Sequence, residues 1–532
     1  MNTQRFQQRL TALAALPLPA SPAAGLEGLE KESLRVTGDG RLAQTPHPPA
    51  LGSALTHPHI TTDYSEALLE FITPPAQRPE TGLEFLDEIH RFVYAVLPED
   101  ELLLCTSMPI GFERDEDIPI ARYGESNIGR MKHVYRVGLA HRYGRAMQAI
   151  AGIHFNYSLP TALWPRLSPL LGLGPASQAS QASAYFALIR NVQRYGWLLL
   201  YLFGASPAAD RRFLRCRGGI PQGFEALTPD TYALPFATSL RMSDIGYKNK
   251  TQATLFISTN DLDEYVRSLC HAIETPHPPY QAIGVRVGGR YRQLNANILQ
   301  IENEYYSPIR PKQIARPCEK PTLALKRRGV RYVEVRALDL NPFEPLGIDA
   351  GQMRFLELFL WFCLLQASPP LDREENRRCQ DNLLLTAQRG RDPQLRLHDD
   401  DGEEIPLRQW AERILHCLEP LSRLFDENGG DGAYGRALAA QRGKVSDPET
   451  TPSARMLAEM TARGESFAAF ALRLSKAHAD HFRHRPLADD RRRWFEALAR
   501  QSWAEQRRLE REDHLSFEDF LRRYFSETCQ AA

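Results

Sequence analysis

Neither charge nor hydrophobic residues are concentrated in this sequence of 532 residues. Lys and Arg together number 65, and so do Asp and Glu. This balance creates no long-range field that would attract nucleic acid or an anionic membrane. No run of about 18 apolar residues occurs, which argues against a helix that spans a membrane. The composition therefore favours neither nucleic acid nor a membrane as a partner.

Cysteine is also scarce, at eight residues, and no two cysteines form a C-x-x-C pair. This spacing gives no common zinc site and no disulfide framework, so we expect mostly buried thiols in a reducing compartment, the cytoplasm. At the N-terminus, two arginines precede an apolar stretch, as in a signal peptide, but prolines interrupt the stretch. Its spacing predicts an ordinary amphipathic helix with Phe6, Leu10 and Leu13 on one face.

Several catalytic signatures are absent. The sequence has no G-x-x-x-x-G-K-[ST] loop and no complete G-x-G-x-x-G, so a bound nucleotide would not be held by a Walker-type loop. Gly38 and Gly40 instead fit a hairpin turn between residues 35–36 and 41–42. There is no G-x-S-x-G nucleophile elbow and no H-E-x-x-H zinc motif. Chemistry must therefore come from other charged residues.

The sequence changes in character near residue 370. Before this point, short β-like runs alternate with helical stretches, and after it charged, helix-favouring residues dominate. We predict a catalytic core of residues 1–370 and a mostly helical region of residues 371–532 packed on it.

Three segments predict strands with polar residues on one face: residues 28–36, 152–159 and 331–338. Side chains at i and i+2 share one face of a strand. The pairs placed together in this way are Glu30 and Glu32, His154 and Asn156, and Glu334 and Arg336.

Two further segments also carry aligned carboxylates. Residues 299–306 predict a strand with Glu302, Glu304 and Tyr306 on one face. A short β-like run, residues 59–63, ends at Asp63, and residues 65–71 have the composition of a helix. Asp63 and Glu70 are about two helical turns apart, so they would face the same way if that helix begins early.

These carboxylates suggest a site for divalent cations. Like charges that face each other in a sheet destabilise it unless something neutralises them. Magnesium prefers carboxylate oxygens and is commonly shared with substrate phosphates. A multi-metal phosphate site would use the carboxylates of Glu30, Glu32, Asp63, Glu70 and Glu334, and His154 could add an imidazole ligand.

Simpler interpretations remain open from the residues alone. Each carboxylate could be solvated on the outer face of an antiparallel sheet, and His154 could be a structural histidine. Paired carboxylates also serve as acid and base in glycosidases. Basic residues favour an anionic ligand instead, because Arg241, Arg310 and Lys312 could bind carboxylate or phosphate, although a surface salt bridge is the alternative for each.

Six motifs, in the same order, resemble those of the bacterial, proteobacterial-type glutamate–cysteine ligases. They are residues 28–35 (GLEKESLR), 51–57 (LGSALTH), 60–74 (ITTDYSEALLEFITP), 201–207 (YLFGASP), 300–312 (QIENEYYSPIRPK) and 332–336 (YVEVR). The similarity is weak beyond residue 370. The resemblance implies an α+β fold like that of glutamine synthetase, with a curved antiparallel sheet that forms a funnel-like active site and helices outside.

The resemblance also implies a reaction. ATP would phosphorylate the γ-carboxylate of glutamate, and the cysteine amine would then displace phosphate to give γ-glutamylcysteine, the first step of glutathione biosynthesis. The cofactor would be Mg²⁺ or Mn²⁺, with ATP as cosubstrate. The expected partners are small molecules, namely glutamate, cysteine and ATP, and we expect a monomer.

The resemblance assigns roles to individual residues, motif by motif. The metal ligands would be Glu30, Glu32, Asp63, Glu70, His154 and Glu334. Glu334 and Arg336 would be catalytic. The amino-acid substrates would be bound by Tyr135, Arg136, Gln148, Arg241, Tyr247 and Tyr306. ATP would be bound by Asn156 and Arg310.

Three alternatives are left by this reasoning. A related ATP-dependent carboxylate–amine ligase would have the same metal face and a different acceptor amine. A non-catalytic binding protein derived from a ligase would be expected to lack motif carboxylates, yet all of them are present. A helical interaction scaffold would rest on residues 371–532, and truncation of that region would test it.

Overall fold

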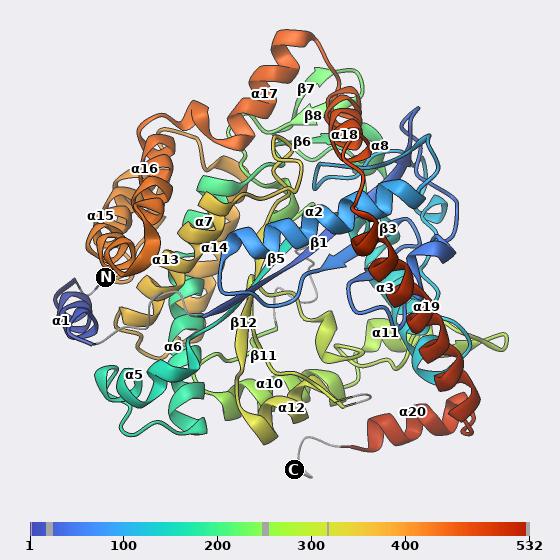
Figure 1. Cartoon of the computed structure of the whole chain (residues 1–532), viewed down its shortest axis with the longest axis horizontal. Helices are drawn as coiled ribbons and strands as arrows, with labels where there is room; N and C mark the ends of the chain where they lie inside the picture. Colours follow the sequence, from blue (N-terminus) through green and yellow to red (C-terminus); the bar gives the residue numbers. More distant parts are fainter. Residues whose placement is uncertain (2, 17–24, 247–254, 317–318, 528–532) are drawn as a thin grey trace.

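A seven-stranded antiparallel sheet forms the centre of this computed structural model, which describes residues 1, 3–16, 25–246, 255–316 and 319–527 (Figure 1). The strand order is β11-β12-β5-β1-β3-β2, and β4 also pairs with β1. The strands are β1 (Leu26–Thr37), β2 (Ile60–Thr62), β3 (Leu68–Ile72), β4 (Glu101–Leu103), β5 (Ile153–Ser158), β11 (Ile309–Lys312) and β12 (Tyr332–Leu338). The predicted α+β class with an antiparallel sheet is confirmed.

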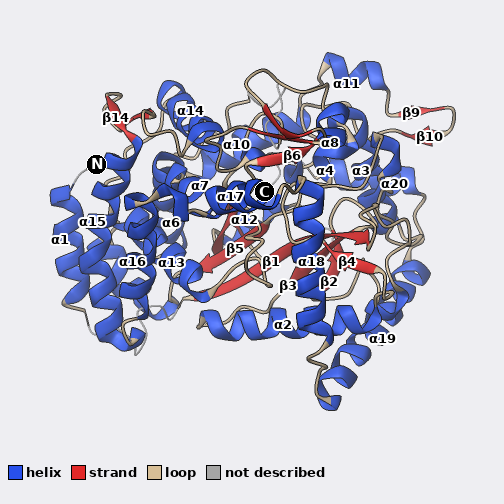
Figure 2. Ribbon diagram, turned by 90° about the horizontal axis from the view of Figure 1, so that it is seen from above, coloured by secondary structure: helices blue, strands red, loops and turns tan. Residues whose placement is uncertain are grey.

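One face of the sheet packs against two helices, α2 (Pro79–Val96) and α13 (Ala350–Leu365) (Figure 2). Lys31 of β1 points to this face, and its Nζ lies 2.7 Å from Nε2 of His90 on α2. Tyr157 of β5 donates a 3.0 Å hydrogen bond to Oε1 of Glu357 on α13. Because strand side chains alternate, the residues next to Lys31 point to the other face.

The remaining elements surround this core. Those before residue 370 include α1 (Thr3–Ala14), α3 (Asn127–Tyr143), α4 (Arg145–Gln148), α5 (Trp164–Leu170), α6 (Gln178–Tyr195), α7 (Trp197–Phe203), α8 (Arg211–Cys216), α10 (Leu262–Glu274), α11 (Pro278–Ile283) and α12 (Pro321–Arg328). Two small sheets lie in this part, formed by β6 (Ala208–Asp210), β7 (Glu225–Thr228) and β8 (Thr231–Ala233), and by β9 (Arg286–Val287) and β10 (Arg290–Tyr291). The predicted N-terminal helix is confirmed, since α1 buries Phe6, Leu10 and Leu13.

Helices dominate after residue 370, as the composition predicted. They are α14 (Arg373–Arg389), α15 (Leu407–Phe425), α16 (Ala433–Ser446), α17 (Pro452–Arg463), α18 (Phe467–Arg483), α19 (Asp489–Glu512) and α20 (Phe517–Ser526), with one hairpin of β13 (Arg396–His398) and β14 (Glu404–Pro406). Figure 1 shows α18, α19 and α20 passing along one side of the molecule, in red. Among the described residues, no helix has the length and hydropathy needed to cross a membrane.

Two predicted elements are wrong. Residues 65–71 do not form a helix; Leu68–Ile72 is strand β3, paired with β1 and β2. Residues 299–306 do not form a strand; they contain a single 3-10 turn, Glu302–Glu304, and the strand of this region, β11, begins at Ile309. At residues 68–72, pairing with the sheet decides the outcome over local composition.

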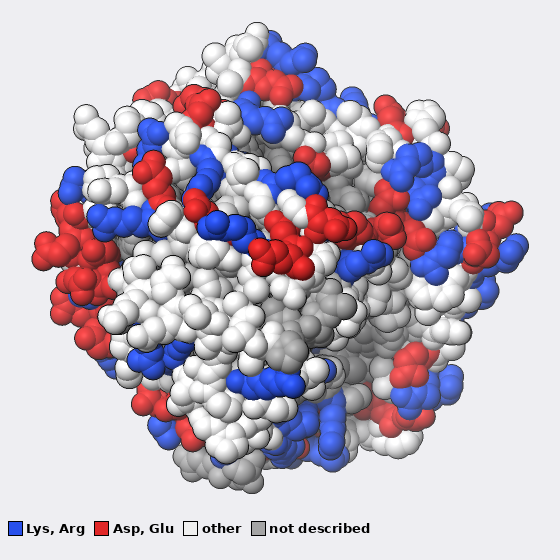
Figure 3. All heavy atoms as spheres, turned by 60° about the vertical axis from the view of Figure 1, so that its left-hand side comes forward, with Lys and Arg blue, Asp and Glu red and all other residues white. Residues whose placement is uncertain are grey.

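The distribution of charge on the surface and the state of most described cysteines are as the composition leads one to expect. Acidic and basic side chains are interspersed over most of the face in Figure 3, as equal numbers of each sign lead one to expect. Cys105, Cys363, Cys379 and Cys417 are buried free thiols. Cys270 is disulfide-bonded, an exception within the expectation of mostly buried thiols.

Candidate active site

A cavity of about 580 Å³ lies over the face of the sheet opposite α2 and α13. Its walls come from the sheet, from α3, from the segment between residues 301 and 312, and from α14 and α20. It is lined by these predicted site residues: Glu30, Glu32, Asp63, Glu70, Tyr135, Arg136, Gln148, His154, Arg241, Tyr306, Arg310, Glu334 and Arg336. Asn156 does not line it, and Tyr247 lies outside the described residues.

Strand register explains why residues far apart in sequence meet in this cavity. Glu30 of β1 lies opposite His154 of β5, and Glu32 lies opposite Glu70 of β3. Glu334 of β12 lies opposite Asn156 of β5 on one side and Arg310 of β11 on the other. Residues directly opposite one another in an antiparallel pair point to the same face. The face predicted from alternation is therefore continuous across five strands.

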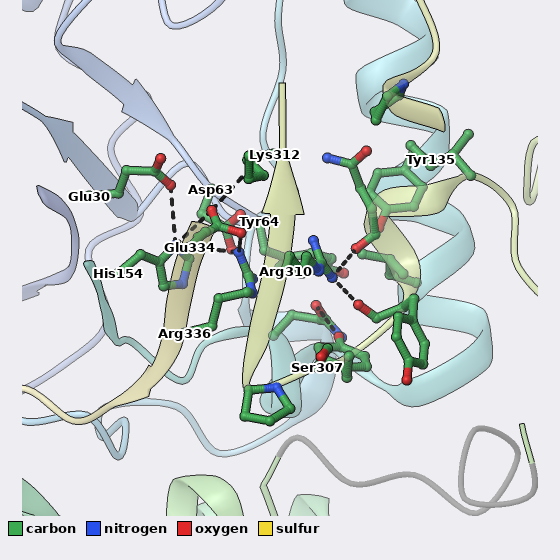
Figure 4. A pocket seen from close by; sticks show the side chains of 18 of the residues that line it. Glu30, Asp63, Tyr64, Tyr135, His154, Ser307, Arg310, Lys312, Glu334 and Arg336 are labelled. Carbon is green, nitrogen blue, oxygen red and sulfur yellow. Dashed lines mark hydrogen bonds and ion pairs between the residues drawn. The ribbon is translucent and has the colours of Figure 1, made fainter. Parts of the chain in front are cut away.

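His154 lies at the centre of the carboxylates (Figure 4). Its Nδ1 is 3.2 Å from Oε2 of Glu30 and 3.7 Å from Oε1 of Glu334, and its Nε2 is 3.7 Å from Oε1 of Glu32. One atom each of Glu30, His154 and Glu334 lie within 4.8 Å of one another. Carboxylate oxygens with an imidazole nitrogen are suitable donors for a divalent cation.

The electrostatics of this group also fit a bound cation. Burial, and then the charge of Asp63, raises the pKa of Glu32 to about 8. Burial and the neighbouring charges of Glu30, Asp63 and Glu32 hold the pKa of Glu70 well above its usual range. Carboxylates crowded in this way ionise readily only when positive charge is added.

Glu334 has the opposite environment. Burial alone would raise its pKa, but Lys312 and Arg336 hold the pKa of Glu334 well below the usual value. Nζ of Lys312 is 3.1 Å from its Oε1, and Nη1 of Arg336 is 3.1 Å from its Oε2. Nη1 of Arg336 is also 3.4 Å from Nδ1 of His154. One end of the acidic face thus carries two cations that can also meet an anionic substrate.

Arg241 is enclosed beside this group and is only 1% exposed. Its Nη2 donates a 2.9 Å hydrogen bond to the carbonyl of Arg336, and its Nη1 is 3.8 Å from Oδ1 of Asp339. The guanidinium passes close to the backbone of Gly152, where an added Cβ would lie 2.1 Å from Nη2. A glycine is therefore needed directly before β5 for Arg241 to reach the cavity.

Other predicted residues are placed by polar contacts. Nε2 of Gln148 donates a 3.0 Å hydrogen bond to the hydroxyl of Tyr306. Nη2 of Arg310 donates to the carbonyl of Asn303 at 3.1 Å. Nδ2 of Asn156 donates a 2.9 Å hydrogen bond to Oε1 of Glu30, so in this structure Asn156 orients a carboxylate behind the cavity lining.

Glu302 and Glu304 do not join the acidic face, although the predicted strand would have aligned them. Oε1 of Glu304 accepts hydrogen bonds from Arg142 at 2.8 Å and from Tyr143 at 2.6 Å. Oε1 of Glu302 accepts a 2.6 Å hydrogen bond from Thr322. Both carboxylates are buried in structural contacts, because the 3-10 turn replaces strand alternation.

Several residues lining the cavity were not predicted. They include Lys132 on α3, Gln193 on α6, Asn376, Cys379, Gln380 and Leu383 on α14, and Tyr524 on α20. The helical spacing of Lys132, Tyr135 and Arg136 could have indicated Lys132. No sequence pattern indicated that α14 and α20 reach the cavity.

Comparisons with known proteins point to one family. The family model for glutamate-cysteine ligase matches residues 15–385. The glutamate–cysteine ligase of Pseudomonas entomophila is 54% identical over 499 residues, 94% of this chain and 93% of the relative. That of Azotobacter vinelandii is 53% identical over 525 residues, 98% of each chain.

Two solved structures extend the similarity to the fold. The crystal structure of a bifunctional glutathione synthetase from Pasteurella multocida is 26% identical with a TM-score of 0.71, and the match covers 93% of this chain and 58% of that one. Glutamate–cysteine ligase from Francisella tularensis, in complex with AMP, is 38% identical with a TM-score of 0.89, and the match covers 96% of this chain and 99% of that one. This chain belongs to the glutamate–cysteine ligase family.

Proposed function

We propose that this protein joins the γ-carboxylate of glutamate to the amine of cysteine with hydrolysis of ATP to ADP and phosphate, the first step of glutathione synthesis. The observation that carries this function is the convergence of the acidic face and its cations in one cavity of a member of the ligase family. The AMP bound to the related Francisella tularensis protein supports a nucleotide as cosubstrate.

The reaction has two group transfers. First, an oxygen of the glutamate γ-carboxylate attacks the terminal phosphorus of ATP, which gives γ-glutamyl phosphate and ADP. The cysteine nitrogen then attacks the acyl carbon, the bond from that carbon to the phosphate oxygen breaks, phosphate leaves and the nitrogen loses a proton. Such chemistry depends mainly on positioning and charge stabilisation, and Arg336 would contact the transferred phosphate.

The acidic face would hold magnesium, or manganese, through Glu30, Glu32, Asp63, Glu70, His154 and Glu334. When bound, the cation would supply positive charge that offsets the negative charge of the phosphates. The chain itself orients the carboxylates, since Asn156 donates to Glu30 and the backbone amide of Gly152 donates to Glu32 at 2.6 Å.

The opposite walls would bind the organic substrates. Arg241, with its enclosed guanidinium, suits a substrate carboxylate. Tyr135, Tyr247 and Tyr306 would surround the cysteine, and Gln148 would fix the hydroxyl of Tyr306. Arg136 would be a further amino-acid contact and Arg310 a nucleotide contact.

The family assignment suggests four further properties, which we add to the proposal. We propose a sheet like that of glutamine synthetase, curved into a funnel around the cavity, which its antiparallel pairing supports. We also propose a monomer, a cytoplasmic location, and a division into a catalytic core of residues 1–370 and a C-terminal region of residues 371–532. Residues of α14 and α20 in the cavity support a direct role for that region in the site.

The test is ADP release by the purified protein with Mg-ATP and glutamate, with and without cysteine. We expect strong stimulation by cysteine and a product with the mass of γ-glutamylcysteine. Assays with 2-aminobutyrate and with ammonia separate the alternative acceptors. Stimulation by another amine alone would overturn the substrate, and no ADP release from folded protein would overturn the ligase activity.

A further inference from the structure

The helix α3 presents two basic side chains to the cavity, and only one of them has a role so far. Lys132 and Arg136 are one helical turn apart, and both line the cavity. Residues four apart on a helix are neighbours on one face. The same face carries Ile128, Met131, Tyr135 and Leu139, which also line the cavity.

Both cations are packed against one aromatic ring. Nζ of Lys132 is 5.1 Å from the ring centre of Tyr123, and the guanidinium carbon of Arg136 is 4.6 Å from it. The hydroxyl of Tyr123 donates to the backbone carbonyls of Thr62 and Asp63, both at 2.8 Å. The ring is thus fixed at the end of β2, and it holds both cations beside the acidic face.

Neither cation is held by a direct ion pair within the described chain, although the charge of Glu70 acts on both. Arg136 donates hydrogen bonds to two backbone carbonyls, those of Asp63 and Lys132, the latter at 3.0 Å. Among the described residues, no Asp or Glu forms an ion pair with Lys132 or with Arg136. Burial and the charge of Arg136 lower the pKa of Lys132, and the charge of Glu70 opposes this shift. A buried ammonium that has no direct ion pair is costly.

A structural lysine at this position would be expected to pair with one of the carboxylates nearby. Glu70 and Asp63 line the same cavity, yet the ammonium lies over the Tyr123 ring instead. Two cations that are fixed at the cavity wall and form no direct ion pair with its carboxylates are suited to an anion that arrives with the substrate.

We propose that Lys132 is a further substrate-binding residue, which together with Arg136 binds an anionic oxygen group of a substrate, either a carboxylate or a phosphate. This inference rests on the proposed ligase function. A carboxylate would come from glutamate or cysteine and a phosphate from ATP, and the two sources differ in the ligand whose binding depends on Lys132.

The test compares Lys132→Met with Lys132→Arg, which keeps the charge. Arg130→Met is the matched control, because Arg130 is an exposed cation of the same helix that lies over the ring of Phe517 and does not line the cavity. For each protein, KM is measured separately for glutamate, cysteine and ATP, along with kcat, the melting temperature, and equilibrium binding of Mg-ATP and of glutamate.

We expect Lys132→Met to raise KM for one substrate by about 10- to 100-fold, the loss of a charge-assisted hydrogen bond. Lys132→Arg should retain most of the affinity of the wild type, and Arg130→Met should have the same KM values as the wild type. A rise for ATP identifies a phosphate, and a rise for glutamate or cysteine identifies a carboxylate.

Two results would overturn the inference. One is Lys132→Met with all KM values, kcat and ligand binding unchanged. The other is a general loss of activity with a lowered melting temperature in both Lys132→Met and Lys132→Arg. That result would indicate that Lys132 contributes to packing alone. A wild-type protein without ligase activity would contradict the proposed function. Equilibrium binding requires no turnover, so it would still show whether Lys132 contributes to ligand binding.

Discussion

Individual carboxylates in the cavity differ in the residues that hold them, and the role of each can be tested by substitution. Glu334 is buried and its charge is balanced by Lys312 and Arg336. Glu30 accepts one hydrogen bond from Asn156 and lies beside His154. Replacing a carboxylate by its amide keeps the shape and removes the charge, so the loss falls on cation binding more than on packing.

We expect Glu334→Gln and Glu30→Gln each to lower kcat by on the order of 1000-fold, because cation binding and charge stabilisation are both weakened. Thermal melting should show that both variants remain folded. The matched control is Glu84→Gln, an exposed glutamate on α2. Rates like those of the wild type in both variants at saturating magnesium would refute the metal assignment.

At the scale of elements, the sequence predicted strands well where alternation is supported by β-branched and aromatic residues. β1, β5 and β12 were predicted within a few residues, and their alternation placed Glu30, His154 and Glu334 on one face. Residues 65–71 were predicted as a helix because Glu, Ala and Leu favour helices locally. Pairing with β1 and β2 makes them a strand, and a single sequence does not contain that long-range contact.

The contribution of α20 to the cavity could not be predicted for a related reason. Its apolar residues Phe517 and Leu521 pack with Met131 and Val134 of α3, which brings Tyr524 to the cavity wall. The amphipathic pattern of a helix tells which face is buried. It does not tell which distant helix covers that face.

Ending the chain at Ser516 should therefore raise KM for at least one substrate by about tenfold, equivalent to the loss of roughly 1.4 kcal/mol of binding energy. Tyr524→Ala should produce part of this effect. Arg523→Ala, at an exposed position on α20, is the control. A truncated protein with the kinetic constants of the wild type would show that α20 is accessory to the reaction.

For the whole molecule, the division near residue 370 describes composition better than it describes contacts. A buried network crosses it behind the sheet. Glu357 of α13 accepts hydrogen bonds from Tyr157 of β5 at 3.0 Å and from Tyr434 of α16 at 2.7 Å. Nε1 of Trp361 donates to the hydroxyl of Tyr157 at 2.9 Å. Sheet, core helix and C-terminal helix thus share one buried carboxyl group.

This network makes a prediction about stability and pH. Burial raises the pKa of Glu357 from 4.5 to about 7, and burial with the charge of Glu357 also raises that of Glu27. Below pH 4.5 Glu357 is protonated in the folded and the unfolded chain, and no penalty arises. Between pH 4.5 and 7 the unfolded chain releases this proton while the folded protein keeps it, so stability falls as pH rises.

The full cost at Glu357 is on the order of 3 kcal/mol once pH exceeds both values. Glu357→Gln cannot ionise, so the stability of this variant relative to the wild type should increase from pH 4.5 to 7.5. Melting temperatures of both proteins across that range measure the difference, which cancels groups that titrate alike in both. A difference that stays constant, or that decreases with pH, would mean that Glu357 is ionised in the folded protein. The network would then be held by a charged carboxylate between two tyrosine hydroxyls.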